Sequence, residues 1–498
     1  MAGYQHGVRV QEQATSLLAP ILGTAGLQVV FGTAPVNLAE DPYSVTNTPV
    51  IAYSWSEAVK KLGYSPDYKN YTLCQSMYAS FQLVGVAPVV FVNVLDPKKH
   101  KKTNEAQTVD VVDLEATVKL TGILQDTVTV QADGVDLALD TDYILAFDDD
   151  GYLTVTLVAS GAGAAAASLV VTSTSIDPEA VDANDVIGVS ATGGEKGFEV
   201  LRQVYPRLGM TPGLLLAPGW SHIPDVGIVL AAKCEEINGY FTCECFVDID
   251  STPDGCTAYD KVKMQKEAQG CTNKHTMALW PCLAVGSSWF RYSSIMRALT
   301  AYLDANNDEA DCNTENDAHP NNHDPPNLSP ANTLIGVTGT VLADGETEIT
   351  LDQLQGNAVN GFGVTTAINV NGWRTWGNNT AAYPATTDPK DRWFCCRRFF
   401  SWWGNSFILT YFQKVDDPAN IRLVETIVDS ENIRGASYVA DQKCARAEIV
   451  FLASENAVTD LIDGKLRFHQ YLTPYPPAED IMNTLEFDPY ALQTALGG

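Results

Sequence analysis

The sequence has no excess of positive charge. Of its 498 residues, 31 are Lys or Arg and 60 are Asp or Glu, which gives a formal net charge of -29. A field of this sign repels a phosphate backbone, so the composition argues against nucleic acid as a partner. It favours solubility and keeps free subunits apart until another interaction outweighs the repulsion.

Export and membrane signals are also missing. The opening MAGYQHGVRV is polar and has no apolar core segment, which predicts synthesis and folding in a cytoplasm. The longest apolar run, residues 83–92, contains Pro88 and is too short to cross a bilayer, so we expect no direct membrane insertion. The eleven cysteines are an odd number, and we expect no disulfide framework.

The familiar catalytic motifs do not occur. We find no G-x-S-x-G elbow, no P-loop, no H-E-x-x-H and no G-x-G-x-x-G after a predicted strand. Ser221 and His222 are adjacent in sequence, but the members of a catalytic triad converge from distant positions. We therefore predict a protein that is not an enzyme, with no catalytic residue and no cofactor.

Two groups of residues could ligate a metal. Cys243 and Cys245 share one face of a predicted strand, and further cysteines and His275 lie nearby, but paired CxxC-type spacing is lacking. We favour reduced cysteines packed in a core. His319 and His323 lie in a proline-broken acidic stretch, where a surface cation site is conceivable. Our prediction is no metal site.

The order of elements predicts alternating strands and helices around an inserted β segment. Strands at 27–31 and 89–95 enclose helices at 54–62 and 71–84, the first with Ser54 as its N-cap. Residues 101–180 hold 14 acidic and 3 basic residues and alternate with a period of two. Asp133-Gly134 and Asp150-Gly151 predict hairpins there. Later elements are predicted as helices at 195–205, 224–236, 287–306, 399–412 and 418–438, and strands at 213–217 and 240–248.

Arginines and aromatic residues alternate in DRWFCCRRFFSWWGNSF, residues 391–407. This pattern can bind single-stranded nucleic acid, but the net charge opposes that interpretation. We favour a core strand running into a buried helix, with the arginines pairing acids at an interface. Residues 390–470 contain 11 basic and 11 acidic residues, a neutral balance that suits contact with another subunit.

Both ends of the chain have the pattern of free strands. In YQHGVRVQEQ, Val8 and Val10 would face one way and Arg9 and Gln11 the other. A final extended segment at 485–496 mirrors this one. A strand without a partner is a liability unless another chain completes it.

Several stretches, in order along the chain, resemble the tail sheath proteins of contractile phage tails and R-type bacteriocin particles. They are HGVRVQEQ, VVFGTAPVN, SEAVKKLGYSPDYKNYTL, FVNVLDP, LLLAPGWSHIPDV, EEINGYFTCECFVDID, NGWRTWGNNTA, CCRRFF and PYPPAEDIMNTLEF. The acidic insertion departs from the family pattern.

The resemblance implies an α/β (α+β) multidomain fold, with an assembly domain built from the N- and C-terminal parts of the chain. We predict an N-terminal arm (1–24), an α/β core part (25–100), the all-β insertion (101–180), a middle α/β domain (181–330), a C-terminal assembly domain (331–484) and a C-terminal arm (485–498).

The resemblance also implies function. Subunits polymerise as stacked rings in a helical homo-oligomer around a tail tube, and contraction drives the tube through a cell envelope. Each arm would add a strand to a neighbour's sheet, with hinges near 14–20 and 474–477. The candidate arm residues are Val8, Arg9, Val10, Gln11, Leu485, Phe487 and Leu492.

Partners and location follow from the same resemblance. The expected partners are the tail tube protein, the baseplate proteins and the tail terminator protein. The candidate contacts with the tube are Arg434, Lys443 and Arg446. The location would be a virion tail or bacteriocin particle, assembled in the host bacterial cytoplasm. Two alternatives stay open: an α/β hydrolase-type enzyme with a β substrate-binding insertion, and a shell or surface-lattice protein.

Overall fold

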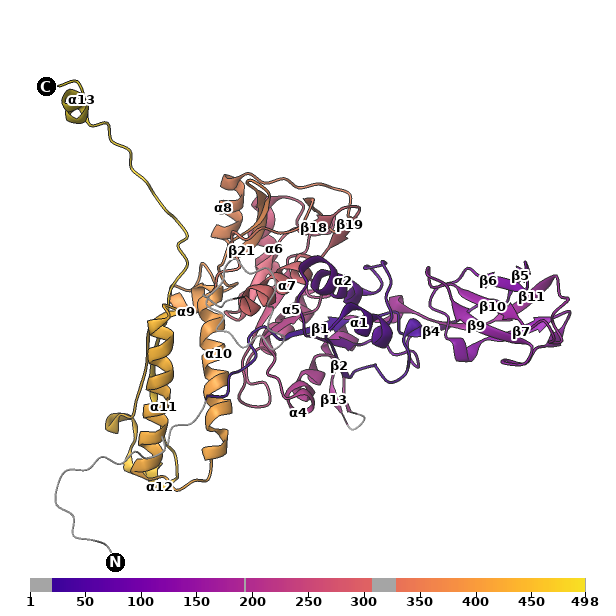
Figure 1. Ribbon diagram of the computed structural model, residues 1–498, viewed down its shortest axis with the longest axis horizontal. Helices are drawn as coiled ribbons and strands as arrows, with labels where there is room; N and C mark the ends of the chain where they lie inside the picture. Colours follow the sequence, from indigo (N-terminus) through magenta and orange to yellow (C-terminus); the bar gives the residue numbers. More distant parts are fainter. Residues whose placement is uncertain (1–19, 192–193, 307–327, 498) are drawn as a thin grey trace, which may run out of the picture.

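The computed structural model describes residues 20–191, 194–306 and 328–497. Figure 1 shows three regions along its longest axis, with a β domain at one end, a mixed α/β body in the middle and a pair of long helices at the other end. This mixed architecture confirms the predicted fold class.

One eight-stranded sheet forms the body. Its spatial order is β2 (Pro49–Ala52), β3 (Val89–Asn93), β1 (Gln28–Gly32), β15 (Leu214–Leu216), β16 (Glu244–Asp248), β17 (Thr276–Leu279), β21 (Val364–Asn369) and β22 (Trp373–Trp376). The inner strands run parallel, and β2 and β22 pair antiparallel at the edges. Parallel strands buried on both faces read as continuous apolar runs, and β1 and β3 are buried throughout. The sheet therefore joins strands from three segments that we predicted as separate parts of the fold, residues 25–100, 181–330 and 331–484.

Helices and small ribbons complete the body. The helices are α1 (Trp55–Leu62), α2 (Thr72–Tyr78), which continues as a π-helix (Ala79–Val84), α3 (Ala183–Ile187), α4 (Val204–Leu208), α5 (Pro224–Ala232), α6 (Val262–Ala268), α7 (Tyr292–Ala305) and α8 (Gln353–Gly361). A three-stranded ribbon contains β18 (Cys282–Val285), β19 (Ser288–Phe290) and β20 (Gly339–Val341), and β13 (Ser190–Ala191) pairs with β14 (Gly194–Glu195). Ser54 caps α1 as predicted, since its side chain accepts a hydrogen bond from the Glu57 N–H.

The β domain has a hydrophobic core of its own, separate from that of the body. It contains β5 (Gln107–Asp110), β6 (Glu115–Val118), β7 (Thr129–Ala132), β8 (Val135–Asp136), β9 (Tyr143–Phe147), β10 (Leu153–Leu157) and β11 (Ser168–Thr172). The antiparallel pair β4 (Lys101–Thr103) and β12 (Thr174–Ile176) joins it to the body. Both predicted hairpins form, and Asp133 and Gly134 have the positive φ angles that a tight hairpin turn requires.

The region farthest from the β domain contains α9 (Pro389–Arg392), α10 (Phe394–Tyr411), α11 (Ile421–Ala440), β23 (Cys444–Val450), α12 (Val458–Ile462) and β24 (His469–Pro474), followed by the final segment with α13 (Pro489–Ala495). Residues 391–407 are helical except Trp393, which makes an isolated β-bridge with Asn379, so the predicted core strand is wrong. The predicted helix at 287–306 begins only at Tyr292, because Ser288–Phe290 pairs with β18.

The extended C-terminal segment predicted at 485–496 is wrong in its second half. Asp488 caps α13 by accepting hydrogen bonds from the Tyr490 and Ala491 N–H groups, and Pro489 occupies the first helical position. Leu485 and Phe487 precede this helix, whereas Leu492 lies within it. Local capping chemistry thus overrides the alternating pattern.

Candidate assembly site

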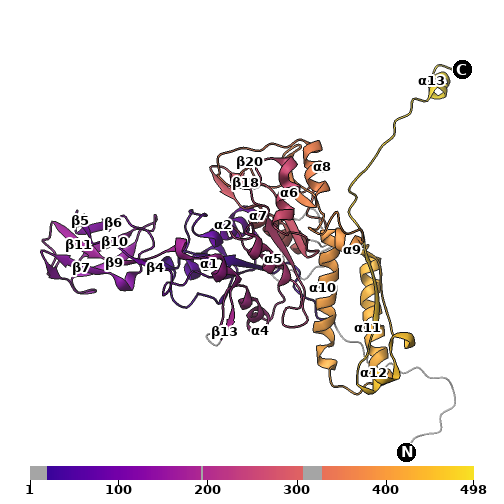
Figure 2. The same cartoon turned by 180° about the vertical axis from the view of Figure 1, so that it is seen from behind.

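The described chain begins at the helical region at one end of the body, and its C-terminal segment departs from the same region (Figure 2). The N-terminal segment, residues 20–25, lies along α10, and the C-terminal segment, residues 475–497, follows β24. We call these elements, α10, α11, β23, β24 and the two flanking segments, the assembly region.

A stripe of polar side chains on α10 holds the N-terminal segment. Thr410 Oγ1 accepts a hydrogen bond from the Ile21 N–H at 2.9 Å, and Ser406 Oγ accepts one from the Gly23 N–H at 2.9 Å. Trp402 Nε1 donates to the Gly23 carbonyl at 2.9 Å. Residues spaced four apart share one helix face, so one stripe binds the backbone of this segment.

Arg398 extends the stripe and joins it to the body. Its guanidinium donates to the Ala25 carbonyl at 3.3 Å and makes a two-pronged ion pair with Asp304 of α7, in which Nη1 to Oδ1 is 2.9 Å. Both side chains are buried. Sequence reasoning expected the arginines of this stretch to pair acids at an interface, but Arg398 pairs inside its own subunit.

The C-terminal segment is fixed at its root and then leaves the body. Arg392 Nη2 contacts Glu479 Oε2 at 2.7 Å, and Cys396 Sγ lies 3.8 Å from the Tyr475 carbonyl oxygen. Beyond Glu479 the chain extends away from its own subunit (Figure 1). The departure point therefore lies a few residues after the predicted hinge at 474–477.

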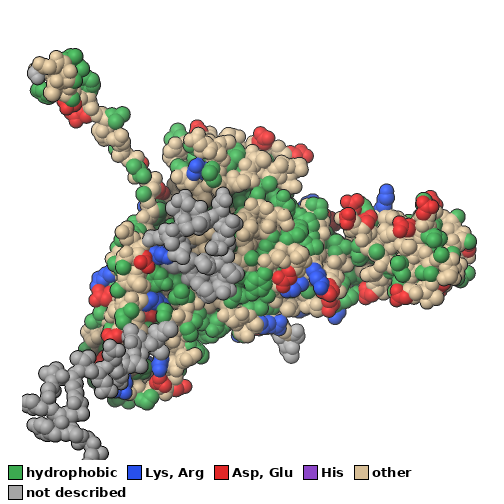
Figure 3. Space-filling model, viewed as in Figure 1, with side chains coloured by type: hydrophobic (Ala, Val, Ile, Leu, Met, Phe, Trp, Pro, Cys, Tyr) green, Lys and Arg blue, Asp and Glu red, His purple; other side chains and the backbone are tan. Residues whose placement is uncertain are grey.

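Apolar side chains along this C-terminal segment are largely exposed in the described part of the chain. Leu485 is 87% exposed, Phe487 77% and Leu492 53%. Figure 3 shows hydrophobic side chains along the segment and on α13. Residues 475–498 also carry four acidic and no basic residues. Contiguous exposed apolar side chains are typical of surfaces that contact another molecule.

The predicted N-terminal arm residues Val8, Arg9, Val10 and Gln11 lie outside the described residues, as does the predicted hinge at 14–20 except for its last residue, Pro20. His319 and His323 lie outside them as well.

The three predicted tube contacts differ in exposure. Arg434 is buried: its guanidinium lies 3.9 Å from the centre of the Trp403 ring and 3.3 Å from Glu431. Burial lowers the pKa of Arg434 and raises that of Glu431. Lys443 is also buried, whereas Arg446 is half exposed and contacts Glu448 at 2.8 Å. Only Arg446 presents its charge at the surface of the subunit.

The other sequence candidates lie in the packed interior. Within the described residues all ten cysteines are buried free thiols, as the core interpretation predicted, and burial raises the pKa of Cys74 and Cys271 to about 12. No group of three or more potential metal ligands occurs in the part of the chain that the structure describes. Ser221 bonds to buried Asp248, with Oγ to Oδ2 at 3.3 Å.

Thr72 lies at the position where open α/β sheets usually bind ligands. Chain order reverses between β1 and β15, the position at which such sheets place their sites. Here the first residue of α2, Thr72, packs against both neighbouring turns. A Cβ on Gly32 would collide with Thr72 Oγ1, and one on Gly219 would lie 2.8 Å from Thr72 Cγ2.

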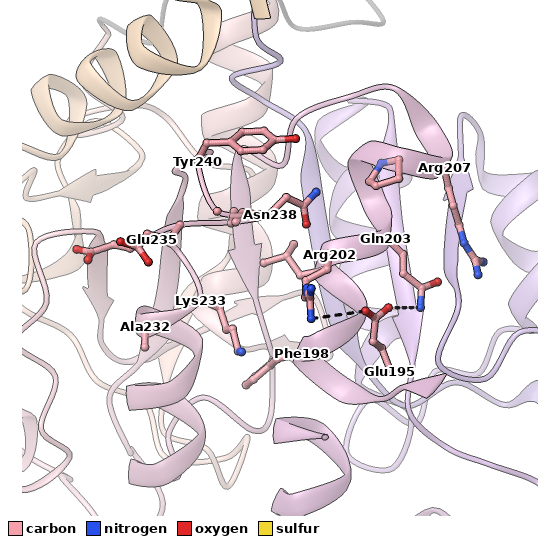
Figure 4. A pocket seen from close by; sticks show the side chains of 15 residues that line it. Glu195, Phe198, Arg202, Gln203, Arg207, Ala232, Lys233, Glu235, Asn238 and Tyr240 are labelled. Carbon is pink, nitrogen blue, oxygen red and sulfur yellow. Dashed lines mark hydrogen bonds and ion pairs between the residues drawn. The ribbon is translucent and has the colours of Figure 1, made fainter. Parts of the chain in front are cut away.

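A cavity of about 760 Å³ opens elsewhere on the body, between α4 and α5. Several of its polar lining residues are already engaged: Glu195 lies 3.9 Å from Arg202 and 2.6 Å from Gln203, and Lys233 lies 2.6 Å from Glu199 outside the lining. Figure 4 shows Glu235 and Arg207 on opposite sides of the cavity. The polar groups do not converge on one point, as a catalytic site requires.

Comparison with solved structures defines the class of the fold. The chain superposes on the sheath of an extracellular contractile injection system (PVC) in its contracted state, with a TM-score of 0.57 and 13% identity over 99% of both chains. For the contracted helical sheath of the anti-feeding prophage the TM-score is 0.56, with 12% identity over 97% of this chain and 99% of that one. The fold is that of contractile sheath subunits.

Sequence relatives give the protein's role. The chain is 26% identical to the tail sheath protein of Burkholderia phage BcepMu over 524 aligned residues, which cover 100% of this chain and 99% of the relative. It is 24% identical to that of Escherichia phage P2, over 60% of this chain and 69% of the relative. No family model matches. The resemblance to tail sheath proteins is confirmed, and the chain is a structural subunit of a contractile tail sheath.

Proposed function

We propose that this sheath subunit polymerises helically around a tail tube by lending its terminal segments to neighbouring subunits. The observation that carries the proposal is the C-terminal segment, which leaves its own subunit with Leu485 and Phe487 almost fully exposed. A strand added to a neighbour's sheet would cover these side chains and gain main-chain hydrogen bonds in a fixed register. Such a head-to-tail contact generates a helix when it does not close.

Contraction follows from the same linkage. The subunits first assemble in an extended array, whose free energy is higher than that of the contracted array. A trigger from the baseplate then lets the subunits repack into this shorter and wider array. A covalently continuous segment allows a subunit to rotate without losing its neighbour. The repacking drives the tube through a cell envelope. The partners are further copies of this chain, the tube protein, and the baseplate and tail terminator proteins, brought together in the host bacterial cytoplasm.

The test is negative-stain electron microscopy of the purified full chain beside a variant that ends at Glu479. We expect hollow striated tubes from the full chain and none from the shortened one. A finer variant combines Leu485→Ser with Phe487→Ser and removes only the apolar strip. Its matched control, Thr484→Ser with Glu486→Gln, changes the alternate positions and should still form tubes.

If the shortened chain forms tubes as the full chain does, the C-terminal segment does not link the subunits, and another part of the chain must do so. A second shortened chain, lacking residues 2–16, tests the predicted N-terminal arm in the same preparation. An unlinked enzyme would be indifferent to both truncations, and a shell protein would give closed or planar lattices.

For the tube contact, exposure favours Arg446 over Arg434 and Lys443. We expect Arg446→Glu to change the stability of the subunit by less than about 0.5 kcal/mol, because its ion pair is exposed, and to weaken binding to the tube. Arg434→Glu should instead destabilise the subunit by about 3–5 kcal/mol, because it leaves buried Glu431 facing a second negative charge. Chemical unfolding and tube co-sedimentation separate the two effects, and unchanged tube binding by Arg446→Glu would remove Arg446 as a contact.

A further inference from the structure

Two neighbouring cysteines lie in the first turn of α10, close to the place where the C-terminal segment leaves the subunit. Cys395 and Cys396 are both buried, and with Trp393 they form a small cluster apart from the main core. Trp393 is the N-cap residue and has no side-chain oxygen for the N–H groups of this turn. Such N–H groups favour a negative charge, which a thiolate can supply.

Asn378 directs a second donor at the first of these thiols. Its carbonyl accepts a hydrogen bond from the Phe394 N–H at 2.9 Å, which fixes it beside the helix start, and its Nδ2 donates to Cys395 Sγ at 3.2 Å. The side chain is buried, and within the described residues its Oδ1 has no hydrogen-bond partner. Leaving a buried acceptor unpaired costs free energy, so this orientation of the amide points to a role for the N–H donor to sulfur.

The two thiols differ in how readily they ionise. Hydrogen bonds from the Cys396 thiol and from Asn378 lower the pKa of Cys395, although burial opposes the shift, and the positive charge of Arg398 adds to it. The same contact between the thiols, together with burial, raises the pKa of Cys396. Burial raises the pKa of the other eight described cysteines. Among the described thiols, Cys395 is therefore the best suited to ionise, and its neighbour keeps a proton.

We propose that Cys395 and Cys396 form a redox pair, which hydrogen peroxide converts into a disulfide between neighbouring residues. The Cys395 thiolate attacks one peroxide oxygen, which breaks the O–O bond and gives a sulfenic acid and hydroxide. The Cys396 sulfur then attacks the Cys395 sulfur, the S–O bond breaks, and the departing hydroxide takes the Cys396 proton to form water. The pair loses two electrons, and the peroxide gains them.

The position of the pair gives the oxidation a structural consequence. Cys396 Sγ donates to the Tyr475 carbonyl at 3.8 Å, at the root of the C-terminal segment. The disulfide has no thiol proton, so oxidation removes this contact and leaves the root to interactions such as the exposed Arg392–Glu479 pair. Tyr475 is itself 49% exposed, so a small movement of the root admits an oxidant of the size of peroxide.

The disulfide should also be easy to reduce. Consecutive Cα atoms lie about 3.8 Å apart, which is less than the ~4.4–6.8 Å usual for disulfides, and strained disulfides are labile. The pair would stay reduced in a cytoplasm and close outside the cell. That setting rests on the proposed assembly in the host cytoplasm, whereas the chemistry belongs to the subunit alone.

The test is peroxide treatment of the purified full-length chain, followed by alkylation, trypsin digestion and mass spectrometry. Both thiols lie in one tryptic peptide, residues 393–397. We expect this peptide to lose two hydrogen atoms at least tenfold faster than Cys74 or Cys444 is oxidised, and dithiothreitol to restore it. Cys396→Ser should stop the reaction at a sulfenic acid on Cys395, which dimedone traps, and Cys395→Ser should leave Cys396 reduced.

A second pair of variants tests the amide donor. Asn378→Leu removes the bond to sulfur and should slow the oxidation several-fold, whereas Asn357→Leu, at an exposed position of α8, should not. The melting temperature of each variant shows whether the fold is kept. An unchanged oxidation rate in a folded Asn378→Leu chain would remove Asn378 from the site.

Two outcomes overturn the redox pair itself. One is oxidation of residues 393–397 no faster than that of Cys74, and the other is a disulfide that links two copies of the chain on a non-reducing gel. Hydrogen exchange over residues 475–479 should rise after oxidation, and unchanged exchange would remove the effect on the segment root. Each measurement uses the free subunit, so failure of tube assembly would not be mistaken for failure of this chemistry.

Discussion

Arg398 determines how the assembly region is attached to the body. This buried guanidinium contacts Asp304 on α7 and the Ala25 carbonyl of the N-terminal segment. A force applied to α10 or to that segment would therefore reach the α/β body through a buried ion pair. Removing one partner of such a pair typically costs about 3–5 kcal/mol, because the other charge stays buried without compensation.

His222 gives the subunit a dependence on pH. Burial, together with the positive charge of Arg291, lowers the pKa of this imidazole to about 4, although Asp250 opposes the shift. An unfolded histidine titrates near 6.5. As the pH falls through 6.5 the unfolded chain takes up a proton and the folded one does not. Stability is therefore present above that pH and is lost progressively towards pH 4.

We predict that this one group removes about 2–3 kcal/mol from the free energy of unfolding between pH 7 and pH 4, allowing for the partial exposure of the ring. Chemical unfolding of the parent chain and of His222→Gln at both pH values measures the difference. The substitution should flatten the pH dependence by that amount. Equal slopes for the two chains would show that the histidine titrates normally in the folded state.

At the scale of elements, α10 works as a clamp for the N-terminal segment. Its polar stripe binds three successive stretches of backbone, at Ile21, Gly23 and Ala25. The pattern was visible in the sequence as residues spaced four apart, Arg398, Trp402, Ser406 and Thr410. Sequence analysis missed it because these residue types also occur on ordinary buried helices.

Removing the two hydroxyls of the clamp should loosen the segment without unfolding the body. For Ser406→Ala with Thr410→Val we expect a loss of about 1–3 kcal/mol, since each neutral hydrogen bond contributes about 0.5–1.5 kcal/mol. Hydrogen exchange at the Ile21 and Gly23 amides should rise about tenfold or more. Amides of β1, deep in the sheet, serve as the internal reference. An unchanged exchange rate at Ile21 and Gly23 would mean that other contacts hold the segment.

At the scale of the whole molecule, the β domain is an attachment with its own core. It connects to the body through the β4–β12 pair, where the Asn104 N–H donates to the Ser173 carbonyl at 3.0 Å. Residues 105–172 hold twelve acidic residues and one basic residue. Repulsion between neighbouring β domains would oppose premature tight packing of an assembled sheath.

Replacing residues 105–172 by Asn-Gly closes β4 and β12 as a short hairpin. We expect the body to keep its melting temperature within a few degrees and assembled sheaths to contract more readily. The shortened sheath should also respond less to salt, because screening removes the same repulsion in the parent. The fraction of contracted sheaths, counted by electron microscopy over a salt series, is the measurement. Identical curves for the two chains would exclude a role of this charge in contraction.

The sequence alone determined the features that arise from neighbouring residues. The Ser54 cap, both Asp-Gly hairpins, the buried strands near 28–32 and 89–93 and the role of the protein as a sheath subunit could all be predicted. Capping, turn conformation and the order of family motifs are local or linear properties of a chain. These properties can be predicted without information on tertiary packing.

Tertiary structure decided the contacts between distant residues. The Arg398–Asp304 pair spans 94 positions of sequence, and Asn432 meets Ile449 only because α11 folds back along β23. The burial of Arg434 likewise depends on Trp403 from another helix. Such contacts depend on packing summed over the whole chain, and many alternative pairings fit the same local pattern. The sequence thus predicted which segments serve assembly, and the fold determined which of their described side chains are exposed.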